Sequence, residues 1–146
     1  MFNLDAWDGF PTERAELLNF ISRERIKNVV FASGDVHAAL DIVLHPDGVV
    51  RGGEGCAVEV VGTSISSWPL QPGLTKIWGE DAGRILAQKN PQFAWTDYAS
   101  NGYTKLSFTE TAMTVEHFAA DSVTNARSPV RMVRRASVPA GRAQFV

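Results

Sequence analysis

The chain has 146 residues, of which 45% are hydrophobic, and carries a formal net charge of −2. This length suits one domain with an adequate core, and the charge gives no reason to expect nucleic acid or an anionic membrane surface as a partner. No stretch approaches the roughly 18 apolar residues of a membrane span. With no repeat, linker or signal-peptide pattern, we expect a single domain over residues 1–146.

The first predicted elements are a helix and a buried strand. A turn-rich segment, residues 5–11, leads into an amphipathic helix over residues 12–25, whose first turn suits Pro11. The apolar, uncharged run Val29–Ala32 follows. Such a run is typical of a central strand that is buried on both faces.

The segment after this strand carries the chain's main candidate for chemistry. Gly34 permits a tight bend, and Asp35 and His37 then leave the carboxyl end of the strand, where open α/β sheets tend to place their sites. A carboxylate and an imidazole from one turn suit a divalent or trivalent cation. Ordinary turn chemistry also explains an Asp after Gly, so the spacing leaves both interpretations open.

Two further strands are predicted before the middle of the chain. The first, residues 40–44, ends in a turn over residues 45–48, where we expect an exposed His45. The second, residues 56–61, begins with Cys56, which we interpret as a small buried hydrophobe rather than a nucleophile. The polar loop 62–69 lacks the spacing and lysine of a nucleotide-binding P-loop.

The rest of the chain predicts one helix and a run of strands. The helix covers residues 76–89 and ends before Pro91, and the strands cover 93–98, 103–108, 113–118 and 130–138. We expect His117 on the exposed side of its strand, and the arginines of the last strand on a solvated sheet edge. The predicted class is α/β (α+β), with a mostly mixed or antiparallel sheet.

Four segments, taken in order, resemble the C-terminal portion of PhoD-like alkaline phosphatases, a branch of the calcineurin-like metallophosphoesterases. They are residues 5–11 before the helix, residues 28–37 with their Gly-Asp-Val-His motif, residues 58–67, and residues 90–92 leading to 101–103. The resemblance implies half of a metallophosphatase-type β-sandwich flanked by helices.

The same resemblance implies a site and a substrate class. In that family the Gly-Asp-Val-His motif supplies ligands to a multinuclear metal centre, which implies Asp35 and His37 here, with iron and calcium as the metals. Its members hydrolyse phosphate mono- and diesters and are typically exported. Trp7, Asp8 and Ser64 are further candidates for the rim of the substrate site.

Two departures from the family pattern limit this expectation. The family's other ligand motifs lie N-terminal to the region matched here and are not found, and Gln92 stands where the family's Asn-Pro-His is expected to have a histidine. We therefore expect half an active site, completed by a homo-oligomer or by a chain carrying the missing N-terminal half. The alternatives are a non-catalytic remnant that self-associates or binds a partner, and a plain α+β binding domain whose Asp35 and His37 are only turn residues.

Overall fold

The computed structural model describes residues 6–46 and 54–146. In these residues, three α-helices, one short 3₁₀ helix and seven strands form. The helices are η1 (Trp7–Gly9), α1 (Pro11–Arg23), α2 (Gln71–Trp78) and α3 (Ala82–Lys89). The strands are β1 (Val30–Ser33), β2 (Ala39–Leu44), β3 (Ala57–Val61), β4 (Phe93–Asp97), β5 (Gly102–Phe108), β6 (Ala112–Ala120) and β7 (Val130–Pro139).

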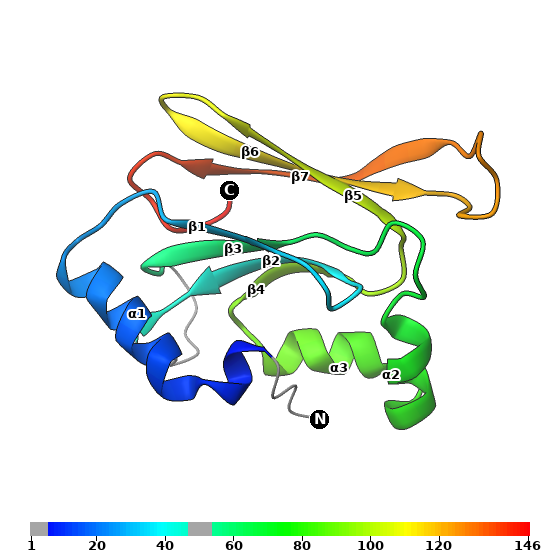
Figure 1. Cartoon of the computed structure of the whole chain (residues 1–146), viewed down its shortest axis with the longest axis horizontal. Coiled ribbons are helices and arrows are strands. Elements are labelled where there is room, and N and C mark those ends of the chain that lie inside the picture. Colours follow the sequence, from blue (N-terminus) through cyan, green and yellow to red (C-terminus); the bar gives the residue numbers. More distant parts are fainter. Residues whose placement is uncertain (1–5, 47–53) are drawn as a thin grey trace.

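The strands form two sheets that lie face to face. The larger sheet has the order β1-β3-β2-β4, in which β1 runs parallel to β3 and the other neighbours are antiparallel. The smaller sheet, β5-β6-β7, is antiparallel. Figure 1 shows it over one face of the larger sheet, with the helices on the other face. The predicted mixed α/β class, two sheets flanked by helices, is confirmed.

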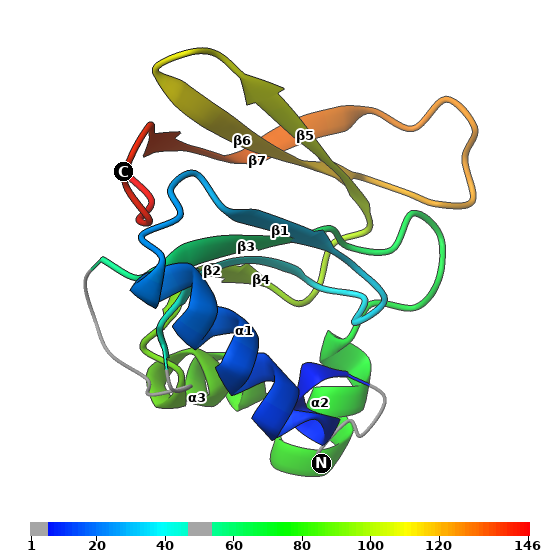
Figure 2. The same cartoon turned by 60° about the vertical axis from the view of Figure 1, so that its left-hand side comes forward.

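Two apolar clusters hold the layers together. Between the sheets, Val58 and Val60 of β3 pack against Met113, Val115 and Val138. On the helix side, a second cluster joins β2 to α2 and α3; its buried members are Ala38, Leu40, Ile42, Val61, Leu74, Ala82 and Tyr98. Each fully buried aliphatic side chain contributes about 1.5–3 kcal/mol, so these clusters dominate the stability of the fold. Figure 2 shows α1 crossing the helix-side face in front of the sheet.

The first strand is shorter and less buried than its sequence indicates. β1 is an edge strand in the described part of the chain, with Val30 and Phe31 partly buried and Ala32 and Ser33 exposed. The prediction of a central strand buried on both faces is therefore wrong. The physical reason is the strand order, because among the described strands only β3 lies beside β1.

The helix predicted over residues 76–89 is two helices. α2 begins five residues earlier than expected and ends at Trp78. Gly79 follows it, with a φ of 84° in the left-handed region that favours glycine. The chain then turns into α3, which ends at Lys89, as expected. The apolar residues of this segment do lie on helices, but the break at Gly79 divides the segment into two.

The histidines outside the 34–37 loop are both buried. His45 was expected to be exposed in a turn, but it is only 7% exposed; residues 47 and 48 of that turn lie outside the described residues. His117 was expected on the exposed face of its strand, but it is 1% exposed between the two sheets. Strand alternation was predicted correctly for β6, and the two faces were assigned the wrong way round.

The last strand lies at a sheet edge, as predicted, but its arginines do not all face solvent. Arg131 and Arg135 are exposed, whereas Arg134 reaches the buried Asp41 of the other sheet. Across the two described ranges, no helix combines the length and the apolar character needed to cross a lipid bilayer.

Candidate functional site

Two loops meet at the carboxyl ends of β1 and β3. Because these strands are parallel and end in register, at Ser33 and Val61, the loops that follow them leave the same edge of the sheet. The Gly62 amide donates a hydrogen bond to the Ser33 carbonyl (2.9 Å) and fixes the two loops side by side at their origin. The Asp35–His37 segment therefore lies against the polar loop 62–69, two segments that are far apart in sequence.

The backbone of the first loop is unusual at both candidate ligands. Asp35 has a φ of 72° and His37 a φ of 57°, in the left-handed region that few non-glycine residues adopt. Gly34 was expected to supply the bend, but its own φ is not positive, and a Cβ there would meet only the Gly62 carbonyl at 3.7 Å. Such left-handed residues cost about 1–3 kcal/mol each and tend to occur at functional sites, where surrounding contacts hold them.

The contacts that hold His37 also define the tautomer of its neutral ring. Its Nδ1 lies 2.8 Å from the carbonyl oxygen of Trp68, and its own carbonyl accepts a hydrogen bond from the Leu70 amide (3.0 Å). A carbonyl can only accept, so Nδ1 must carry the proton. In the neutral imidazole, Nε2 is then left with a free lone pair. Metal-ligating histidines are oriented by the same kind of second hydrogen bond.

The loop that supplies the Trp68 carbonyl is itself braced. The Asn101 side-chain amide donates to the Ser67 carbonyl (2.7 Å) and to the Ser64 carbonyl (3.1 Å), and lies 2.9 Å from the Ser64 hydroxyl. The Ser64 hydroxyl in turn donates to the Ser67 carbonyl at 2.9 Å. Ser64 thus shares the loop that orients His37, and its hydroxyl stabilises that loop.

Asp35 and His37 stand two residues apart on this loop, and within the described residues no hydrogen bond or ion pair joins their side chains. The Asp35 side chain is exposed and that of His37 is partly buried. Among the described residues, no group of three or more His, Cys, Asp or Glu side chains is placed to hold a metal ion. A polynuclear centre needs more ligands than this loop offers.

The other two rim candidates lie at the start of the first helix. Asp8 pairs with Arg14 at 2.7 Å, and Trp7 is 46% exposed. Within residues 6–46 and 54–146, neither forms a hydrogen bond or ion pair with Asp35 or His37. The Asp8–Arg14 pair gives Asp8 a local role at the helix start.

Cys56 does not have the character of a nucleophile. Its thiol is partly buried and donates weakly to the Leu44 carbonyl at 3.5 Å. Burial raises the pKa of the Cys56 thiol, with a smaller opposing effect from a backbone hydrogen bond. A raised pKa disfavours the reactive thiolate, which agrees with the interpretation of Cys56 as a packing residue.

Sequence reasoning missed two side chains that shape this site. Asn101 was noted only as part of a family-like segment, although it braces the loop beside His37. Glu59 accepts a hydrogen bond from the Ser33 hydroxyl (2.6 Å) directly before the Gly34–His37 loop. A single acidic residue in the otherwise apolar strand 57–61 was the available signal for Glu59; nothing in the sequence indicated the contacts of Asn101.

Two large hollows lie beside the described elements, and Asp35 and His37 line neither of them. The larger, about 570 Å³, has Asn101, Asp121 and Arg131 among its lining residues. The other, about 420 Å³, opens between α3 and β4, where Arg84, Trp95 and Tyr98 are among its lining residues. These concave surfaces and the candidate ligands are therefore separate. We give greater weight to the loop, because its donor groups are held in a defined geometry.

Comparisons of this chain with known proteins point to one protein family. A family model described as PhoD-like phosphatase matches residues 1–117. The chain is 40% identical over 67 residues to alkaline phosphatase D of Bacillus subtilis (strain 168), a match covering 46% of this chain and 12% of that protein. A solved structure of PhoD is similar, with a TM-score of 0.76 and 26% identity, covering 92% of this chain and 25% of that one. The chain thus spans a quarter or less of the length of these relatives.

Proposed function

Because the chain belongs to the PhoD-like phosphatase family, we propose that it forms part of the active site of a metal-dependent phosphoester hydrolase, with Asp35 and His37 as metal ligands. In this proposal residues 1–146 are one domain, equivalent to the C-terminal segment of the family's fold. Its substrates are phosphate monoesters or diesters.

One observation carries the proposal. The hydrogen bond from His37 Nδ1 to the Trp68 carbonyl leaves Nε2 as the nitrogen that can bind a cation. Asp35, two residues earlier, offers carboxylate oxygens from the same strained turn. Metal-ligating histidines are oriented by a second contact of this kind, which supports the ligand interpretation.

The donor set fits the metals that the family resemblance implies. Imidazole nitrogen suits iron, and carboxylate oxygen suits iron or calcium. Bound metals would hold the phosphate oxygens and lower the pKa of a water molecule for attack. The residues of this chain would hold the metal through Asp35 and His37, while the loop 62–69 keeps the imidazole in place. Trp7, Asp8 and Ser64 are proposed for the substrate rim.

The chain alone is proposed to lack turnover. Two ligands do not enclose a polynuclear site, and the described residues offer no group of three. The remaining ligands would come from a second copy of the chain or from a polypeptide carrying the family's N-terminal motifs. The alternative is a remnant of the same fold that has kept only its binding surfaces.

The experiment measures metal binding and hydrolysis together. The purified chain is titrated with Fe³⁺, Ca²⁺, Mn²⁺ and Zn²⁺ by calorimetry, and assayed with an aryl phosphate monoester and diester. The test variants are Asp35→Ala and His37→Ala. The control is Asp81→Ala, since Asp81 is an exposed carboxylate that, among the described residues, pairs with Arg84 alone. We expect weak metal binding that both test variants abolish and the control retains.

Two results would contradict the proposal. Equal metal binding by the wild type and both test variants would show that Asp35 and His37 are turn residues. Hydrolysis by the monomeric chain would show that the site is complete without a partner, and would overturn the half-site part of the proposal.

A further inference from the structure

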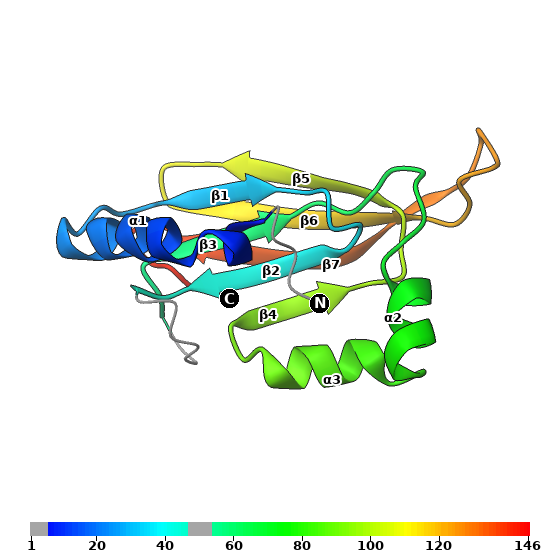
Figure 3. The same ribbon diagram turned by 60° about the horizontal axis from the view of Figure 1, so that its bottom comes forward.

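The first strand has the sequence of a buried strand and the surroundings of an edge strand. The run Val29–Ala32 is apolar and uncharged, whereas exposed edges usually carry charges, prolines or bulges that prevent pairing. Yet Ala32 and Ser33 are exposed, and only β3 lies beside β1 in the described residues. Figure 3 shows β1 along the outer side of its sheet. This composition favours pairing with a further strand along the open side of β1.

The hydrogen-bonding groups on that open side can be identified. The carbonyls of Val29 and Ser33 accept hydrogen bonds from the amides of Val58 and Gly62, so these residues bond toward β3. In a parallel ladder alternate residues bond to the same neighbour. Val30 and Ala32 therefore direct their N–H and C=O groups toward the open edge.

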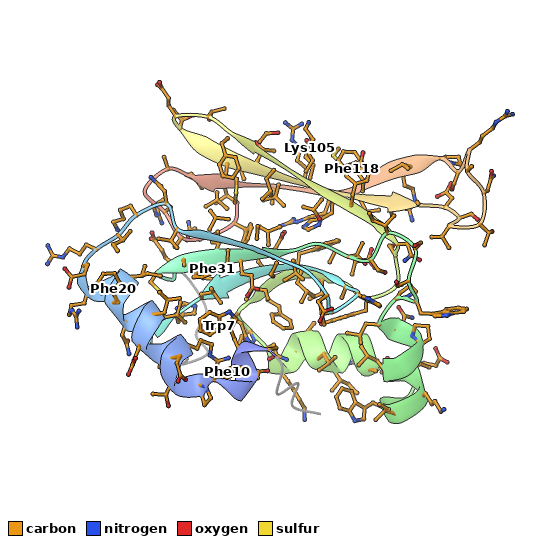
Figure 4. All side chains as sticks on the ribbon, viewed as in Figure 1. Trp7, Phe10, Phe20, Phe31, Lys105 and Phe118 are labelled. Carbon is orange, nitrogen blue, oxygen red and sulfur yellow. The ribbon has the colours of Figure 1, made fainter. Side chains whose placement is uncertain are left out.

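Apolar side chains extend the surface on the helix side of β1. Val30 packs into the cluster between the sheets, so Phe31, its neighbour, points to the face that carries α1. Trp7 and Phe10 lie on this same face and are 46% and 54% exposed (Figure 4). Exposed aromatic residues on one face favour burial against another polypeptide.

We propose that β1 receives a further parallel strand along its open edge, supplied by the polypeptide equivalent to the part of PhoD that this chain does not cover. The inference rests on the proposed function and names the place where the missing half docks. The solved PhoD structure matches 92% of this chain with only 25% of its own length, so most of its polypeptide has no counterpart here.

The direction of the added strand follows from the site. Carboxyl ends of parallel strands meet at one edge of a sheet, so a parallel donor places its following loop beside Asp35 and His37. That loop can supply further ligands. A second copy of this chain cannot do so by symmetric pairing, because a two-fold axis pairs β1 with its copy antiparallel and puts the two Gly34–His37 loops at opposite ends.

The test uses the intact chain and a defined probe, in buffer with a chelator. The chain is co-expressed with the N-terminal segment of Bacillus subtilis alkaline phosphatase D that carries the family's other ligand motifs. Light scattering measures the mass of the complex, and amide hydrogen exchange is followed in the free and bound chain. We expect a one-to-one complex in which the Val30 and Ala32 amides exchange more than about tenfold more slowly.

The variant Ala32→Pro removes an outward amide and leaves the bonds to β3 in place, since proline is tolerated on edge strands. The matched control is Arg135→Pro on β7, an edge strand of the other sheet. Ser137 bonds to Val146 on the outer side of β7, so the Arg135 amide, two residues earlier, also points outward. We expect Ala32→Pro to abolish the complex and Arg135→Pro to retain it, with circular dichroism confirming the fold.

Three results would overturn the proposal: a complex that Ala32→Pro leaves intact, a complex without slower exchange at Val30 and Ala32, and a symmetric dimer of this chain that protects those amides. If Ala32→Pro fails to fold, the rate of amide hydrogen exchange at Val30 and Ala32 in the wild-type complex tests the proposal instead. Because a chelator is present, a complex supports the docking even if Asp35 and His37 bind no metal. Metal binding without a complex would support the proposed function and overturn the docking.

Discussion

His117 and Asp41, 76 positions apart in the sequence, form a buried hydrogen bond between the two sheets, with His117 Nε2 2.9 Å from Asp41 Oδ1. The carboxylate can only accept, so Nε2 carries a proton. Nδ1 lies 2.8 Å from the Thr104 hydroxyl, and Arg134 donates to the second Asp41 oxygen at 3.2 Å. The Trp95 ring stacks on the imidazole at 4.9 Å. This polar network lies inside an otherwise apolar interface.

Removing one member of this network should destabilise the fold strongly. In His117→Ala, the buried Asp41 carboxylate keeps only Arg134, and breaking a buried pair in this way costs about 3–5 kcal/mol. The matched control is Lys105→Ala, which breaks the exposed pair with Glu116 and should cost at most about 1 kcal/mol. Urea unfolding measures both. Equal losses in the two variants would show that the buried network contributes no more than a surface pair.

The sequence predicted most elements because their periodicity is local. Strand alternation in β5 and β6 and the apolar spacing of α1 follow from residues within each element. The face of β6 was assigned incorrectly because the partner of His117 is Asp41, on a strand of the other sheet. A histidine gives no sequence signal of burial when its compensating carboxylate is so distant.

The candidate site shows the same contrast between local and distant signals. Asp35 and His37 stand in one short motif, so the sequence alone could name them as candidate ligands. The contacts that orient them could not be predicted, because the Trp68 carbonyl is a backbone group and Asn101 reaches its loop across 34 to 37 positions. The exposure of β1 was also beyond local reasoning, since an apolar run shows that a strand requires neighbours and not whether they are present.

Gly102 should tolerate no larger residue. A Cβ at this position would collide with the Phe118 carbonyl oxygen on the neighbouring strand. We expect Gly102→Ala to lower the free energy of unfolding by at least about 1–3 kcal/mol, because backbone atoms must move. In Gly73→Ala, a helical position with open space, we expect a gain of about 0.5–1 kcal/mol. Urea unfolding of both variants measures the difference, and a neutral Gly102→Ala would contradict the close approach.

Tyr98 should make the fold sensitive to alkaline pH. Burial raises the pKa of its phenol, partly offset by the nearby Thr96 side chain, and the hydroxyl has no protein partner in good hydrogen-bonding geometry among the described residues. Because the pKa of Tyr98 is higher in the folded than in the unfolded chain, the neutral phenol contributes to stability. This contribution is fully present below the unfolded-state pKa, near 10, and is lost as the pH rises through the folded-state pKa.

Tyr98→Phe tests this directly. Removing an unpaired buried hydroxyl should leave stability at pH 7 unchanged or raise it by up to about 1 kcal/mol. The variant should also lose less stability than the wild type between pH 9 and 11, a range set about the ordinary tyrosine pKa near 10. Thermal unfolding across that range measures both effects. A steeper alkaline loss in Tyr98→Phe would contradict the assignment.

Asn101 should influence metal binding without contacting the metal. Its side-chain amide holds the Ser64 and Ser67 carbonyls, and the next residue of that loop, Trp68, holds His37 Nδ1. In Asn101→Ala the loop loses these bonds, so the imidazole is less well oriented and metal affinity should fall by about 10–100-fold. Asn125→Ala is the control, since the Asn125 side chain accepts one local bond from Arg127 in an exposed turn. Calorimetry of metal binding, with urea unfolding to confirm the fold, measures the effect. A lower metal affinity with unchanged stability would identify Asn101 as a positioning residue. An affinity equal to that of the control would show that the hydrogen bonds of Asn101 to this loop have no influence on His37.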